Sequence, residues 1–144
     1  MIQRTFLVMT MVIGLAAVCC AQETKEEPIA DMDQFWNRTS WRIQNINRLV
    51  NMGDPESEYE RLMYELEKFR SYMDDAEKNL VPENPNKKEQ FLSLTGSLKK
   101  ISDEMINFAY SKNKTNLVEE TNKLFRKYTE LKKLLKEDPM AQFE

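Results

Sequence analysis

The sequence predicts an all-α fold, an antiparallel up-down-up-down four-helix bundle that follows a cleaved signal peptide. Four segments carry apolar residues at alternating steps of three and four, the spacing that keeps side chains on one helix face. The 144 residues include only 3 Gly and 5 Pro, and all the prolines lie outside these segments. Hydrophobic residues make up 41% and charged residues 31%, as in one soluble globular domain.

The first 21 residues differ in composition from the rest of the chain. Arg4 is their only charged residue, an almost wholly apolar run covers residues 6–20, and Ala21 precedes a polar stretch. This pattern predicts a secretory signal peptide that is cleaved after Ala21, and therefore a periplasmic or extracellular protein. The apolar run is shorter than the ~20 residues that a membrane-spanning helix needs. We then expect an acidic, flexible linker at 22–30, the bundle at 31–138 and a tail at 139–144.

Both cysteines, Cys19 and Cys20, lie at the end of this leader. Cleavage after Ala21 would leave no cysteine in the mature chain. The alternative is a lipoprotein acylated at Cys19 or Cys20, which would anchor the protein to a membrane. Val18 stands before Cys19, where a lipoprotein signal prefers a small residue.

Four stripes of residues define the predicted helices and their core faces. The first stripe comprises Trp36, Thr39, Ile43, Ile46 and Val50. The second comprises Tyr59, Leu62, Leu66, Phe69, Met73, Ala76 and Leu80. The third comprises Phe91, Leu94, Leu98, Ile101, Met105 and Phe108. The fourth comprises Leu117, Thr121, Leu124, Tyr128, Leu131 and Leu135. Flanking apolar residues such as Phe35 widen each face to the width of a bundle core.

Residues that stop helices separate the four segments. Gly53 and Pro55 lie between the first two, and Pro82 and Pro85 exclude an unbroken helix across 80–87. The third break is the polar stretch 111–116, after which Asn116 and Glu119 have the spacing of a capping pair. Connections this short force neighbouring helices to run antiparallel.

The composition excludes several kinds of chemistry. The chain has no histidine, so histidine-dependent nucleophiles and histidine-ligated metals are excluded. After loss of the leader, 20 basic and 24 acidic side chains give a net charge of −4, which disfavours nucleic-acid binding. The carboxylates alternate with Lys and Arg, as on solvated helix faces. We therefore expect no enzyme and no metal or other cofactor.

A few residues stand out as candidate sites. Trp41 and Tyr72 lie off or at the margin of the stripes, where a partly exposed aromatic residue can anchor a protein partner. Asn113 heads a glycosylation sequon in a predicted loop. Thr39 and Thr121 interrupt apolar stripes, and we expect their hydroxyls to bond the backbone one turn back.

The last two segments resemble the cytochrome c-prime and periplasmic cytochrome b family of exported four-helix bundles. The resemblance lies in Phe91-x-x-Leu94, Ile101-Ser-Asp-Glu-Met105, Phe108-Ala109 and Val118-Glu119-Glu120. It spans about residues 30–137 and implies the same bundle topology.

Haem ligands of that family are missing here. Its last helix carries Cys-x-x-Cys-His or a lone axial His, and this chain has Leu131-Lys132-Lys133-Leu134-Leu135 instead. The methionine ligand of the b-type members would fall near Thr39-Ser40, whereas Met32 lies about two turns earlier. The resemblance therefore implies a haem-free relative.

Three functions remain open on the sequence. The first is an exported non-enzymatic bundle that binds an unknown protein partner, associates with itself, or serves as a small envelope scaffold. The second is a haem-binding electron carrier with a pocket between the first and last helices, which a Soret absorption band would reveal. The third is a secreted signalling or adhesion protein, which glycan at Asn113 would favour.

Overall fold

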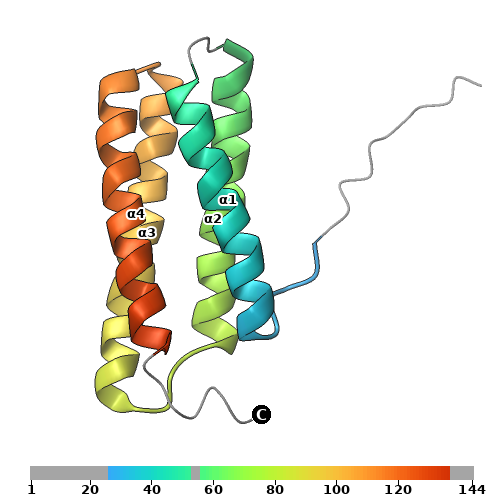
Figure 1. Cartoon of the computed structure of the whole chain (residues 1–144), viewed down its shortest axis with the longest axis vertical. Coiled ribbons are helices and arrows are strands. Elements are labelled where there is room, and N and C mark those ends of the chain that lie inside the picture. The colour runs from blue at the N-terminus through green and yellow to red at the C-terminus, as the bar shows by residue number, and fades with distance from the viewer. Residues whose placement is uncertain (1–25, 53–55, 137–144) are drawn as a thin grey trace, which may run out of the picture.

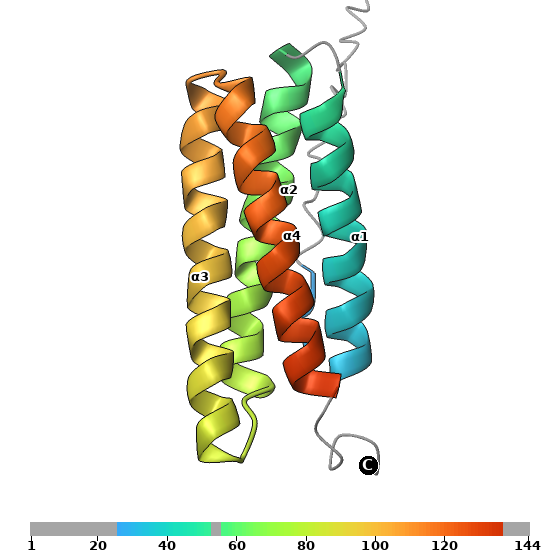
Figure 2. The ribbon, with the colours of Figure 1, turned by 60° about the vertical axis from the view of Figure 1, so that its left-hand side comes forward.

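Four antiparallel helices form a closed bundle in the computed structural model, which describes residues 26–52 and 56–136 (Figure 1). They are α1 (Met32–Asn51), α2 (Glu56–Asn79), α3 (Pro85–Tyr110) and α4 (Lys114–Lys136). Each helix packs against the next along the chain, and α4 returns to pack against α1 (Figure 2). The predicted all-α, up-down-up-down class is confirmed. The leader with Cys19 and Cys20, the loop residues Gly53 and Pro55, and the tail at 139–144 lie outside the described residues.

Side-chain caps fix where α1 and α3 begin. The Asp31 carboxylate accepts a hydrogen bond from the Gln34 amide at 2.8 Å, which satisfies a free donor in the first turn of α1. Asn84 accepts from the amides of Asn86 and Lys87, and Pro85 takes the first helical position of α3.

Helix α4 starts earlier than the sequence predicted. Its cap is Asn113, whose side-chain oxygen accepts from the Asn116 amide at 3.2 Å, so the expected cap pair of Asn116 and Glu119 is wrong. Lys112 adopts a left-handed φ of 51° and turns the chain sharply after α3, which brings Asn113 into the cap position. The predicted glycosylation residue thus has its amide oxygen engaged in a helix cap.

The core follows the predicted stripes closely in α2 and α4. All six fourth-stripe residues are buried, as are Leu62, Leu66, Phe69, Met73 and Ala76 of the second. In α1, Phe35 is fully buried and Trp36 only partly, so the helix turns its flanking aromatic residue inward.

The third stripe is only half correct. Phe91, Leu98 and Met105 are buried, but the other three stripe residues are only partly covered. Thr95, Ser102 and Ala109 take the remaining inner positions instead. Thr95 and Ser102 can enter the core because their hydroxyls donate to the carbonyls of Phe91 and Leu98, one turn back.

The two threonines of the apolar stripes bond as expected. Thr39 donates to the Phe35 carbonyl at 2.6 Å, and Thr121 donates to the Leu117 carbonyl at 2.7 Å. Local bonding therefore satisfies both buried hydroxyls without a ligand or a water.

The core register predicts which leucines carry stability. Leu98→Ala and Leu124→Ala should each lower the free energy of unfolding by about 2–5 kcal/mol, because both side chains are fully buried. Leu92→Ala on the exposed face of α3 is the control, and it should change stability by less than about 1 kcal/mol. Urea unfolding followed by circular dichroism measures all three, and equal losses at Leu92 and Leu98 would contradict the register.

Candidate functional site

The guanidinium of Arg42 lies buried between α1 and α2, with its side chain only 6% exposed. It donates to the Glu65 carboxylate on α2 at 2.7 Å and to the Glu26 carboxylate at 3.0 Å. A longer bond of 3.4 Å reaches the Tyr72 hydroxyl. Its Nε atom has no hydrogen-bond partner among the described residues.

Burial of this charge is tolerated because two carboxylates face it. Desolvation alone would penalise a buried guanidinium by several kcal/mol. Burial pushes the pKa of Arg42 down, but hydrogen bonds with Glu65 and Tyr72 outweigh it and raise the pKa above the ordinary arginine value. The group therefore stays charged, and Glu65, itself buried, is its fixed counter-ion.

The segment 26–30 lies against α1 and α2 and is held by this charge. The Ile29 side chain is fully buried, its amide donates to the Asp75 carboxylate, and its carbonyl accepts from Asn79 at 2.7 Å. At the N-terminal end of the segment, the Glu26 carboxylate accepts a hydrogen bond from Arg42, and the Glu27 carbonyl accepts one from Arg38 at 2.6 Å. These residues were expected to belong to a flexible linker, and in the structure they form a docked segment, here called the strap.

The end of the strap is held by Glu26 and Tyr72 together. The Tyr72 hydroxyl donates a short hydrogen bond to the Glu26 carboxylate. That bond lowers the pKa of Glu26, and the nearby charges of Arg42, Lys68 and Arg38 lower it further. Burial, with the Glu26 charge beside it, raises the pKa of Tyr72 above that of a free phenol, so the phenol remains a donor.

Two exposed aromatic residues flank the buried arginine. The Arg42 guanidinium carbon lies 4.7 Å from the Trp41 ring centre and 5.5 Å from the Tyr64 ring centre. Trp41 is 52% exposed and Tyr64 is 43% exposed, although each ring touches a fixed cation. We call Trp41 and Tyr64 the aromatic platform.

The sequence identified half of this platform. Trp41 is exposed as expected, but Tyr72 is buried because its ring packs beside Arg42 and its hydroxyl bonds Glu26, so its expected exposure is wrong. Tyr64 was missed. Its position between the stripe residues Leu62 and Leu66 places it off the apolar face, and that signal could have found it.

A shallow groove of about 560 Å³ runs beside the platform. Its lining residues come from the strap, α1 and α2, and they are Glu26, Asn37, Arg38, Trp41, Arg42 and Tyr72. The groove thus combines two arginines, an amide and two aromatic rings with one carboxylate. Such a mixture suits recognition of a polar, partly anionic group rather than an apolar ligand.

Aromatic side chains fill the seam between α1 and α4, where the resemblance would place a haem. Trp36 stands edge-on to Tyr128 with ring centres 5.8 Å apart, and Phe69 meets Tyr128 at 6.2 Å. Hydrogen bonds also join α1 to α4 here, because the Tyr128 hydroxyl oxygen lies 2.8 Å from the Thr39 hydroxyl oxygen and 3.0 Å from that of Ser40.

Residues at the family's ligand positions do not fit a haem iron. Leu131 and Leu135 are buried core residues, and a thioether, thiol or imidazole ligand is absent at both. Burial raises the pKa of Tyr128, so its hydroxyl stays protonated within the seam. Residues 26–52 and 56–136 contain no group of three or more acidic or cysteine residues placed to hold a metal ion.

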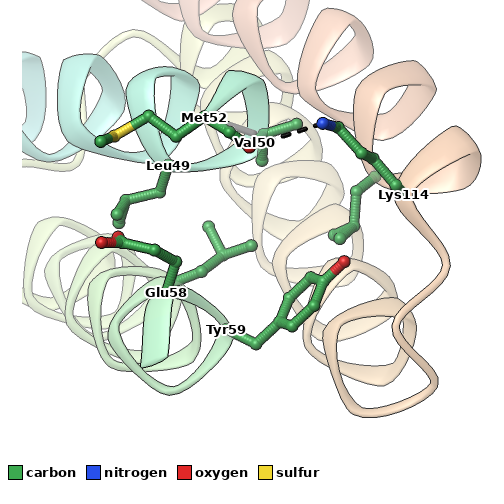
Figure 3. A pocket seen from close by; sticks show the side chains of 8 residues that line it. Leu49, Val50, Met52, Glu58, Tyr59 and Lys114 are labelled. Carbon is green, nitrogen blue, oxygen red and sulfur yellow. Dashed lines mark hydrogen bonds between the residues drawn. The ribbon is translucent and has the colours of Figure 1, made fainter. Parts of the chain in front are cut away.

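A small hollow of about 50 Å³ lies at the bundle end near the α3–α4 turn (Figure 3). Lys114 bonds the Met52 carbonyl across it, and the Tyr59 hydroxyl points toward Lys114 in Figure 3. One oxygen of Glu58 is buried there without a hydrogen-bond partner among the described residues. The volume suits a few water molecules and is far smaller than an organic-ligand pocket of about 300–1,000 Å³.

Comparisons with protein-family models, curated protein sequences and solved structures found no match for this chain. The all-α bundle therefore stands without a family assignment. Within the described ranges, none of the helices is both long and apolar enough to span a membrane.

Removal of the buried counter-ion should destabilise the protein strongly. Glu65→Gln is expected to lower the free energy of unfolding by about 3–5 kcal/mol, because Arg42 would remain buried without its main partner. Glu67→Gln, an exposed position on the same helix, should change it by less than about 0.5 kcal/mol. Chemical unfolding measures both, and a double variant Arg42→Met, Glu65→Leu should recover much of the loss. Equal stability of wild type and Glu65→Gln would contradict the buried pair.

Protonation at low pH should break the contacts of Glu26 with Arg42 and Tyr72, and Tyr72 should lower the pKa at which this happens. The folded pKa of Glu26 lies below the ordinary value, so its contribution is complete above about pH 4.3 and is lost as the pH falls through the folded pKa. Tyr72→Phe removes the phenol donor and should move the Glu26 pKa upward. Carbon-13 NMR titration of the Glu26 carboxyl measures the change, and identical midpoints in the two chains would show that Tyr72 does not hold it.

Proposed function

We propose that this chain is an exported, non-enzymatic helical bundle that acts by binding a protein partner through its α1–α2 face. The observation that carries the proposal is the aromatic platform. Trp41 and Tyr64 are largely exposed, yet both rings contact the same buried guanidinium. Trp, Tyr and Arg are the residues that most often dominate binding energy at protein interfaces.

Fixed rings favour binding because less freedom is lost when a partner docks. An exposed side chain loses about 0.5–1.5 kcal/mol of conformational freedom when an interface immobilises it. Arg42 is itself held by Glu65 and Glu26, so the rings that pack on it are ordered before any partner arrives. Single exposed aromatics are common, but here two on neighbouring helices lie against the same buried cation.

Export and lineage are part of the same proposal. The leader with its Ala21 boundary supports secretion, and the up-down topology with the pattern in α3 and α4 supports a haem-free relative of the cytochrome c-prime bundles. The filled α1–α4 seam favours partner binding over the electron-carrier alternative. The partner would then be met in the periplasm or outside the cell.

Site-directed cross-linking tests this function. A photo-reactive phenylalanine derivative at position 41 should give one specific adduct in the native exported fraction. The same group at Tyr110, an exposed aromatic position on α3, is the matched control and should give none.

Competition makes the cross-link specific. Excess unmodified protein should suppress the adduct at position 41, and excess Trp41→Ala protein should not. Equal adducts from positions 41 and 110, or none from 41, would contradict partner binding through this face.

A further inference from the structure

Positive charges surround the aromatic platform, although the chain as a whole is acidic. Arg38 lines the groove beside Trp41, and the Lys68 ammonium lies 5.6 Å from the Tyr64 ring centre. Helical spacing adds Arg48, seven residues after Trp41, and Arg61, three residues before Tyr64. From Gln34 to Asn51, α1 contains no acidic residue.

Asp33, on the same row of α1 as Asn37 and Trp41, and Glu27 of the strap are exposed acids at the strap end of this face, and its other carboxylates are bound or lie to one side. Glu65 pairs with Arg42, and Asp75 accepts from the Ile29 amide. On α2, Glu60 and Glu67 share a helix row with Arg70 and Asp74. Arg70 and Asp74 form ion pairs with residues on α3, so this row faces away from α1. A negatively charged ligand therefore meets attraction over Trp41, with opposition from Asp33 and Glu27 at the strap end and from the acidic row beyond Tyr64.

An acidic segment already occupies part of this site. The strap has no regular secondary structure, and it places the Glu26 carboxylate on Arg42 and Tyr72. Glu26 keeps 38% of its side chain exposed, whereas Glu65 on the other side of the guanidinium keeps 4%. Glu26 is thus the replaceable partner of Arg42, and Glu65 is the permanent one.

The unpartnered Nε of Arg42 is a second sign of an incomplete site. The residue is 5% exposed, and it lines the groove beside Trp41 and Arg38. A buried guanidinium usually has its donors satisfied, and carboxylates do so in a bidentate manner. A carboxylate with a different approach from that of Glu26 could engage more of these donors.

We propose that the platform binds an extended acidic segment of a partner protein, whose carboxylate displaces Glu26 from Arg42 and Tyr72. This inference rests on the proposed function and names the partner chemistry of the same site. The strap is then an internal competitor that covers the arginine until a better acidic segment replaces it. Trp41 and Tyr64 pack against the incoming segment, and Arg38 and Lys68 attract its charge.

The test uses a peptide of known composition and the full chain without its leader. The probe is a fluorescent peptide with the sequence of residues 22–31, Gln-Glu-Thr-Lys-Glu-Glu-Pro-Ile-Ala-Asp, and a second peptide replaces its glutamates with glutamines. Glu26→Gln protein should bind the acidic peptide about tenfold more tightly than wild type, because the internal competitor is weakened. The glutamine peptide should bind neither protein measurably.

Matched variants separate competition from net charge. Glu27→Gln removes the same charge one residue away, on a side chain that does not contact Arg42, and should leave the peptide affinity unchanged. Adding Trp41→Ala or Arg38→Gln to Glu26→Gln should reverse most of the gain. Circular dichroism and thermal unfolding verify that every variant is folded.

Three outcomes would overturn the proposal. The first is an equal affinity of Glu26→Gln and Glu27→Gln for the acidic peptide. The second is no binding of the peptide to Glu26→Gln at millimolar concentration. The third is self-association of Glu26→Gln without peptide, which would make a second copy of the chain the occupant of the site. If the acidic peptide does not bind but position 41 still gives a specific adduct, the platform binds a partner that it does not recognise through an acidic segment. Peptide binding without an adduct at position 41 would support the acidic-peptide site and contradict the proposed partner in the exported fraction.

Discussion

Burial of one positive charge constrains the whole α1–α2 half of this bundle. Arg42 sits among core residues of α1, where a free guanidinium would be strongly unfavourable. Its neighbours follow from that requirement, because Glu65 must be buried opposite it and Tyr72 must turn its hydroxyl inward. The strap then brings Glu26 as a second carboxylate. Arg42 and Glu65 would each be out of place without the other, so this buried pair forms or fails as a unit, whereas Glu26 is exposed enough to be exchanged.

The same charge links the core to the surface. Trp41 and Tyr64 rest on the outer side of the guanidinium, so rings that would otherwise be mobile have a fixed support. The α3–α4 half is built differently, since its inner residues are apolar or small hydroxyl residues, apart from Glu120, which pairs with the partly exposed Lys123 on the same helix. The exposed aromatic platform thus lies on the half that contains the buried arginine.

Much of the fold was predictable because it depends on periodicity and helix breakers, both of which are local. The α4 stripe was correct to the residue, and the α2 stripe was correct except at its two ends, where Tyr59 and Leu80 are only partly buried. The α3 face was displaced because Thr95 and Ser102 look polar in sequence, while their bonds to the preceding turn allow them inside. The candidate site was harder, because Arg42, Glu65 and Glu26 are far apart in sequence and read as solvated charges. Only the packing of α1 on α2 shows that these three side chains form a largely buried ion-pair cluster.

Amide hydrogen exchange at Ile29 tests the central role of Arg42 most directly. The Ile29 amide is bonded to Asp75 only while the strap is docked, and Met105 in α3 reports on the bundle itself. In Arg42→Met at neutral pH, we expect rapid exchange at the Ile29 amide, while the Met105 amide stays protected. Protection of Ile29 equal to wild type would show that the strap and platform do not depend on the buried charge.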